Sequence, residues 1–316
     1  MRCRVLLNQA GWLSLVAAQA LLGQDLPVTT LRQTGAYTLP ANPSRIARVV
    51  SAGGVLWFLE QNGGWSELLA TDLAGGNQSR FAVQPSPKAV PFPVNTMCAN
   101  ADGRILVGRA GGVGEIYSRA GVLLESMTFP TNASTCVFDQ DVWIQSRTGI
   151  DEVNGRRAGL HVTLPDLPKY AHGDLLALKD HQVGFLESTE GVLYVLDQPT
   201  ATWSRHPLAA PEFQAIRQMP AQENTAIPFF SSPSVLGDEF FAISNGTNRK
   251  LGAKVLRFDS QGKLRARYLC PLPASVTQPT GTNPNGYLSP STVVVVDRTL
   301  LLISTFQKVV AVYSLE

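Results

Sequence analysis

A short apolar stretch that closes on a proline recurs six times along the chain. Four of the five intervals between successive closing prolines lie between 35 and 45 residues, and the fifth is 64. Repetition at this period restricts the fold strongly, because each unit must bury its apolar faces against its neighbours. Proline suits the close of a strand, since it has no amide proton to continue the ladder. The stretches are residues 37–40, 81–85, 127–130, 162–165, 203–207 and 268–271.

The elements between consecutive prolines follow a constant order. Each unit begins with an apolar run, passes a polar or glycine turn and enters its most hydrophobic stretch, such as residues 55–59 or 300–303. Near-continuous apolarity over so few residues indicates strands covered on both faces. A third strand then ends at a turn of Asp, Asn or Gly, as at Asp72 and Asp259, and reverses into the proline-closed fourth strand. Four antiparallel strands in about 40 residues predict the blade of a β-propeller.

The two ends of the repeat array decide the number of blades. The last unit stops after its third strand, at residues 309–314, whereas residues 36–39 precede the first unit and have no partner there. We predict that this N-terminal strand completes the last blade and leaves no open sheet edge beside the termini. The predicted fold is therefore all-β, a six-bladed β-propeller of four-stranded antiparallel blades, with residues 36–316 forming one domain.

The N-terminal residues 1–24 have the pattern of a targeting segment. Arg2 and Arg4 precede a mostly apolar stretch at residues 5–22, in which Ala18 and Ala20 provide small side chains for cleavage. This pattern predicts a secretory signal peptide, and the alternative is an N-terminal anchor that stays attached. We therefore expect a secreted or periplasmic protein with no membrane association beyond this segment.

The cysteine count does not decide whether the chain contains a disulfide. Without Cys3 the chain keeps Cys98, Cys136 and Cys270, so at least one thiol is free. Cys98 and Cys136 fall at similar points of successive repeats, which fits either a disulfide or two small core residues. Their spacing matches no zinc motif.

The net charge of the chain bears on its possible binding partners and does not restrict its fold. A formal net charge of +2 arises from 26 basic and 24 acidic residues. Such a balance gives no electrostatic reason to expect nucleic acid as a partner.

The local motif that carries a family resemblance lies at residues 101–107, whose sequence is Ala-Asp-Gly-Arg-Ile-Leu-Val. Together with the repeat, this Asp-Gly turn before an apolar strand resembles the NHL and TolB-like six-bladed propellers, including gluconolactonase-type relatives. NHL repeats continue with Asp and then Asn, whereas this chain has Gly108 and Arg109, so the resemblance names no subfamily. The gluconolactonase type implies several oxygen ligands for a metal at the channel. Arg109 and Arg147 stand at such positions and would repel a divalent cation, so we expect neither a metal nor another cofactor.

In such propellers the turns after the second strands and the linkers between blades converge on one face around the axis. We predict that the residues of these turns form a candidate binding site at the axial mouth, and the alternative is that they are ordinary polar residues of a solvated rim. Glu60 and Glu187 could also act as an acid and a base. The candidate residues are Glu60, Arg109, Arg147, Glu187, Asn245 and Thr305.

The linker at residues 208–232 is the irregular feature of the repeat. It lengthens one interval to 64 residues and begins a predicted short helix at Pro211, over residues 211–219. We expect this linker to lie over the axial mouth, because a long insertion on one face is often functional.

The sequence favours a binding or interaction module over an enzyme. It contains no nucleophile elbow, zinc-protease motif or phosphate-binding loop that would indicate catalysis. We expect an exported monomer that recognises a protein, peptide or glycan through its loop-bearing face. The alternative is a propeller enzyme, a lactonase, lyase or hydrolase, whose catalytic residues come together only in three dimensions.

Overall fold

The computed structural model describes residues 26–40, 44–62, 65–83, 94–109, 111–130, 133, 135–146, 149–154, 159–164, 173–217, 229–244, 252–272, 292–305 and 307–315. These residues form six four-stranded antiparallel blades, one of which carries a fifth, parallel strand. In blades 1 to 5 the four blade strands follow sequence order from the centre outward. Blade 1 contains β3 (Arg45–Ala52), β4 (Val55–Asn62), β5 (Trp65–Asp72) and β6 (Ser79–Ala82). Blade 2 contains β7 (Val94–Ala99), β8 (Ile105–Arg109), β9 (Val113–Tyr117) and β10 (Leu123–Thr128). Blade 3 contains β11 (Cys136–Phe138), β12 (Val142–Gln145), β13 (Gly149–Asn154) and β14 (His161–Thr163).

The second half of the chain repeats the same order. Blade 4 contains β15 (Gly173–Ala177), β16 (Val183–Glu187), β17 (Val192–Asp197) and β18 (Thr202–Pro207). Blade 5 contains β19 (Phe230–Leu236), β20 (Glu239–Ser244), β21 (Ala253–Asp259) and β22 (Leu264–Cys270). Blade 6 contains β23 (Thr292–Val296), β24 (Thr299–Ser304) and β25 (Val309–Ser314), and its outer strand is β2 (Gln33–Thr38) from the N-terminal part of the chain.

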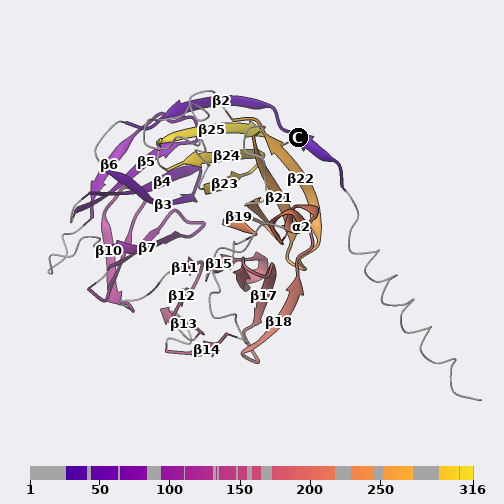
Figure 1. The fold of residues 1–316 in the computed structure, drawn as a ribbon. Coiled ribbons are helices and arrows are strands. Elements are labelled where there is room, and N and C mark those ends of the chain that lie inside the picture. Colours follow the sequence, from indigo (N-terminus) through magenta and orange to yellow (C-terminus); the bar gives the residue numbers. More distant parts are fainter. Residues whose placement is uncertain are drawn as a thin grey trace, which may run out of the picture.

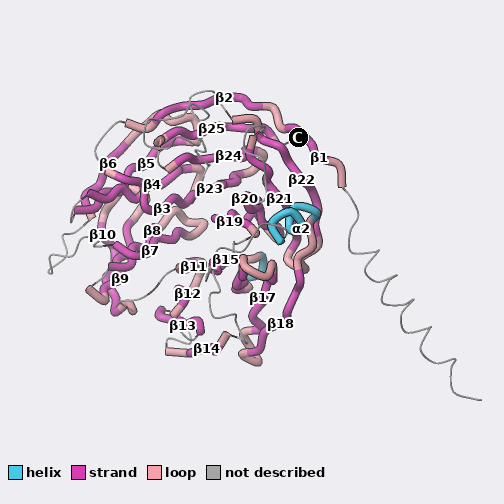
Figure 2. The backbone as a smooth tube through the Cα atoms, viewed as in Figure 1, coloured by secondary structure: helices cyan, strands magenta, loops and turns pink. Residues whose placement is uncertain are grey.

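The pairing of β2 with β25 closes the ring, as predicted. Tyr37 lies opposite Val310 and Ala36 opposite Ala311 in an antiparallel register, so strands from both ends of the sequence lie side by side in Figure 1. The protein is a six-bladed β-propeller. Figure 2 shows mostly strand and loop around the ring, with an α-helix near β21 and β22 and a short 3₁₀ turn, η1 (Lys179–His181), after β15.

A fifth strand on blade 5 is an element that the sequence does not predict. β1 (Val28–Thr30) runs parallel to β22, with Val28 opposite Arg267. The amide of Leu31 continues this contact by donating to the carbonyl of Leu269 at 2.9 Å. The N-terminal segment therefore crosses from the outer edge of blade 5 to the outer edge of blade 6.

The hydrophobic core lies between neighbouring blades. Each of six buried clusters combines side chains from two adjacent sheets, for example Phe58 of blade 1 with Leu301 of blade 6. Trp57 and Trp143 are buried within such clusters, as expected of core residues. The apolar second strands thus have cover on both faces.

The hairpin turns between third and fourth strands follow from their residue types. The Asp72 carboxylate accepts the amides of Ala74 and Gly76 at 3.0 and 2.7 Å. Gly75 has φ +83°, a left-handed conformation that glycine adopts without strain. Asp259 makes the equivalent bonds in blade 5.

The long linker forms the predicted helix, α2 (Pro211–Arg217). Phe213 stacks on Phe229 with ring centroids 4.6 Å apart, inside the core between blades 4 and 5. The described residues of this helix therefore pack into the core between two blades, and the expectation that the linker lies over the axial mouth stays a prediction. Residues 218–228 lie outside the described residues. No helix in the described ranges has the length and apolarity needed to cross a bilayer.

Candidate functional site

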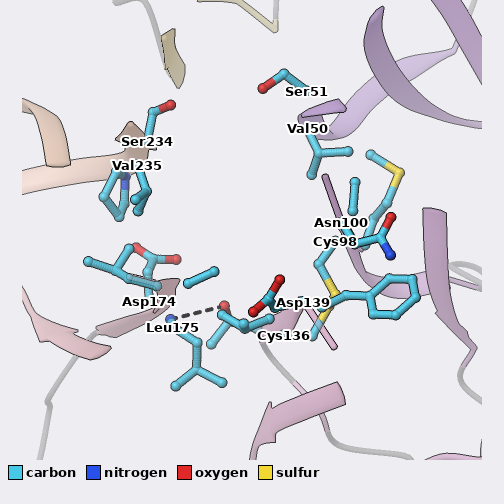
Figure 3. Close-up of a pocket in the computed structure, with 18 of the residues that line it drawn as sticks. Val50, Ser51, Cys98, Asn100, Cys136, Asp139, Asp174, Leu175, Ser234 and Val235 are labelled. Carbon is cyan, nitrogen blue, oxygen red and sulfur yellow. Dashed lines mark hydrogen bonds between the residues drawn. A yellow bond between two sulfur atoms is a disulfide. The ribbon is translucent and has the colours of Figure 1, made fainter. Parts of the chain in front are cut away.

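An axial channel of about 630 Å³ passes among the innermost strands. All six of these strands, β3, β7, β11, β15, β19 and β23, contribute residues to its wall. A cavity between about 300 and 1,000 Å³ is the ordinary size of a small-ligand site. Figure 3 shows Ser51, Asp139, Asp174 and Ser234 arranged around the open centre.

The innermost strands give the channel its polarity. Each has a paired neighbour on one side only, so its inner edge offers backbone donors and acceptors that another group must satisfy. Hydroxyl side chains of one blade accept hydrogen bonds from some of the backbone amides at the inner edge of the next blade. Thr135 accepts the amide of Leu175 at 3.3 Å, and Ser234 accepts the amide of Val295 at 2.9 Å. The remaining edge can hydrogen-bond a polar ligand.

One end of the channel carries an imidazole–carboxylate pair. Asp139 follows β11 and His181 follows β15, so the turns between first and second strands of blades 3 and 4 bring them together. His181 Nδ1 hydrogen-bonds Asp139 Oδ2, and His181 Nε2 lies 3.1 Å from Gln140 Nε2. The hydrogen bond and the negative charge of Asp139 raise the pKa of His181 above its ordinary value.

The backbone that places His181 is unusual. Asp180 and His181 have φ angles of +57° and +61°, and residues other than glycine rarely adopt this left-handed conformation. The carbonyl of His181 accepts a hydrogen bond from Gln198 Nε2 at 2.9 Å. This turn is therefore fastened on both sides, by Asp139 of blade 3 and by Gln198 of its own blade.

A disulfide joins Cys98 of β7 to Cys136 of β11, with Cα atoms 5.8 Å apart. Of the two alternatives from the sequence, the structure has the bridge, and both residues are also buried. It ties the innermost strands of blades 2 and 3 within the channel wall (Figure 3). Cys270 is free and buried, and burial raises the pKa of its thiol.

Glu60, one of the six predicted mouth residues, is fully buried at the junction of blades 1 and 6. Its Oε1 lies 3.2 Å from Lys308 Nζ, and its Oε2 is hydrogen-bonded by Arg80. Lys308 also donates to Ser44 Oγ at 3.1 Å. The carboxylate therefore links three segments of the chain and does not line the channel.

Arg109 and Glu187 also lie at the ends of second strands but are buried. Arg109 Nη1 donates to Glu115 Oε1 at 2.8 Å, while its Nη2 has no hydrogen-bond partner among the described residues. Glu187 accepts the amides of Thr189 and Glu190, each at 2.7 Å, and so shapes the turn that follows. Neither residue lines the channel.

The remaining three predicted residues are placed only in part. Thr305 is half-buried just after β24. Arg147 and Asn245 lie outside the described residues. The structure therefore does not bring the six together into one described site, and their role in binding stays a prediction.

The polar residues that do line the described channel were not selected from the sequence. Asp139 and His181 are 42 positions apart, close to the repeat period, so equivalent turns of successive blades place them side by side. That offset is the signal that could have identified them. Within the described ranges, no group of three or more His, Cys, Asp or Glu side chains is arranged to hold a metal ion.

Comparisons with known proteins support the fold and nothing finer. No family model matches the chain, and no curated protein matches it. The WD40 repeats of RRP9 are similar in structure, with a TM-score of 0.61 at 10% identity, covering 92% of this chain and 100% of that one. A catalytically inactive virginiamycin B lyase from Staphylococcus aureus, solved with quinupristin, gives a TM-score of 0.54 at 12% identity, covering 89% and 88%. At such identities the likeness is one of propeller architecture.

Proposed function

We propose that this propeller is an exported binding module whose axial channel receives part of a protein, peptide or glycan ligand. The observation that carries the proposal is the channel itself, about 630 Å³ in volume and walled by strand edges from every blade. Strand edges, hydroxyls and carboxylates can all hydrogen-bond a polar ligand, and pre-formed concave sites are where such ligands bind.

Export is supported by the chemistry of the cysteines. Disulfides persist in oxidising compartments and are rare where thiols are kept reduced. The Cys98–Cys136 bridge agrees with the targeting pattern of residues 1–24, which lie outside the described residues. Both features support a secreted or periplasmic protein.

A second candidate function is an enzyme. The observation that favours it is the pairing of His181 with Asp139 at the channel end. A carboxylate that orients an imidazole is a common arrangement for general-base catalysis. No nucleophile contacts His181 among the described residues, so the base would have to act on water or on the ligand itself.

A channel-filling variant tests the binding proposal. Ser51 lines the channel, and Ser51→Trp should fill its centre without entering the core between blades. Arrays of peptides and oligosaccharides would be probed with the wild-type chain, with Ser51→Trp and with Ser126→Trp, which places the same side chain on the exposed outer strand β10. We expect ligands bound by the wild type to be lost from Ser51→Trp and kept by Ser126→Trp. Equal retention by both variants, or no ligand at all, would contradict the proposal.

A further inference from the structure

His181 faces more than the axial channel. It also lines a second hollow of about 370 Å³ on the blade 4 side of the same turn. A ligand that extends from this end of the channel can therefore reach the exposed imidazole. The hollow has the volume of a small-ligand site in its own right.

The polar side chains around this second hollow both donate and accept hydrogen bonds. They come from two carboxylates, two amides, one imidazole and one hydroxyl, and no Lys or Arg is among the described residues of the lining. A negatively charged ligand would meet two carboxylates there, with His181 as the one basic side chain of the described lining and Lys179 beside it in the same turn. The residues are Asp180, His181, Gln182, Asp197, Gln198 and Ser204.

A hydroxyl can use both the donors and the acceptors of this lining. It donates and accepts, whereas an ammonium only donates and would pair with the two carboxylates alone. Pro199 adds an exposed apolar ring to the wall, against which the C–H face of a sugar can pack. The balance of donors, acceptors and apolar surface suits a neutral polyol.

The groups are also held in place before any ligand arrives. Asp139 fixes Nδ1 of His181, and Gln198 Nε2 holds the carbonyl of the same residue at 2.9 Å. Gln140 Nε2, 3.1 Å from Nε2 of the imidazole, occupies the position that a ligand hydroxyl would take. Pre-organised contacts lower the entropic cost of binding.

We propose that this hollow is a binding site for a neutral, hydroxyl-rich ligand, an oligosaccharide, with one sugar hydroxyl hydrogen-bonded to His181 Nε2 in place of the Gln140 amide. The inference rests on the proposed binding function and names the ligand class at one end of the channel. It assigns His181, Gln182, Gln198 and Asp180 as ligand contacts and Asp139 as the residue that positions the imidazole.

Calorimetry with the full chain tests the site. The probes are neutral trisaccharides of gluco, galacto and manno configuration, a uronic acid trisaccharide and trilysine. We expect at least one neutral trisaccharide to bind with a dissociation constant of about 1 mM or tighter, and neither charged probe to do so. His181→Ala and Gln198→Ala should each weaken that binding at least about tenfold.

His161→Ala is the matched control, because His161 is also bonded to an aspartate, Asp151, but lies on blade 3 outside the hollow. It should leave the affinity unchanged, and circular dichroism should show that all variants fold. Absence of neutral trisaccharide binding, or equal weakening by His161→Ala and His181→Ala, would overturn the inference. If a peptide nevertheless binds and Ser51→Trp abolishes that binding, the sugar site fails while the proposed function stands.

Discussion

Lys308 Nζ lies 3.2 Å from Glu60 Oε1, across the junction where the last blade meets the first. Both residues are buried, and the carbonyl of Lys308 also accepts the amide of Leu39 at 2.8 Å, just beyond β2. The ring is thus closed in two ways, by the ladder between β2 and β25 and by an ion pair that only the closed ring can form.

Removing one member of this pair should destabilise the whole fold. We expect Lys308→Met to lower the free energy of unfolding by about 2 kcal/mol, because a fully buried carboxylate keeps Arg80 but loses one of its two cations. Urea unfolding measures the change, and Glu60→Gln combined with Lys308→Met should recover part of the loss. Arg265→Met, which breaks a more exposed pair with Asp259, should cost at most about 1 kcal/mol. Equal effects of Lys308→Met and Arg265→Met would show that the junction has no special role.

Two N-terminal truncations distinguish the closure of the ring by β2 from the attachment of β1 to blade 5. A chain beginning at residue 32 lacks β1 but keeps β2, whereas one beginning at residue 41 lacks both. We expect the second truncation to lower the melting temperature far more than the first, because it leaves β25 with an open edge. Differential scanning calorimetry of the two truncated chains measures their melting temperatures. Similar melting temperatures would count against closure of the ring by β2.

The disulfide should stabilise the ring through its effect on the unfolded chain. Bridging two cysteines 38 residues apart restricts that chain by about 2–4 kcal/mol. We expect dithiothreitol to lower the urea midpoint of the wild type by a corresponding amount and to leave the Cys98→Ser, Cys136→Ser double variant unaffected. Alkylation before and after unfolding should find Cys270 protected only in the folded protein, since it is buried. A midpoint insensitive to reductant would contradict the bridge.

His181 should titrate above the ordinary histidine value. Its pKa is raised first by the hydrogen bond that the ring donates to Asp139 and then by the negative charges of Asp139, Asp180 and Asp141, with Lys179 the neighbouring cation. Because the folded-state pKa is the higher one, the pairing stabilises the fold below the unfolded pKa, and this is lost as pH rises through the folded pKa. NMR titration of the ring measures the shift, and Asp139→Asn should move the pKa back toward 6.5. No change in that variant would refute the assigned cause.

The fold followed from the sequence because its determinants are local and repeated. Proline-closed fourth strands and apolar second strands recur in every unit, and turns such as the one at Asp72 join third to fourth strands. The unpartnered strand around Tyr37 had only one place left to pair. β1 escaped prediction because three residues, Val28–Thr30, carry no repeat signal and pair in parallel with an outer edge.

The candidate site was harder to predict because side-chain partners are not local. Glu60 was chosen for its place at a turn, but Lys308, one of the two cations that pair with it, lies 248 positions away. Glu187 was chosen for the same reason, yet its carboxylate serves the backbone of its own turn. His181 follows a first strand, but its pairing with Asp139 depends on how neighbouring blades align, which the sequence does not state directly.

The central claim is that the axial channel receives the ligand. The most direct test is whether the ligand protects a channel residue from chemical labelling. Ser51→Cys places a thiol in the channel wall, and Ser126→Cys places one on the outer strand β10. Labelling of both with a methanethiosulfonate reagent would be followed with and without a ligand selected from the arrays. The account predicts that the ligand slows labelling at residue 51 at least about tenfold and leaves residue 126 unchanged. Equal labelling rates at residue 51 with and without the ligand would show that it binds elsewhere.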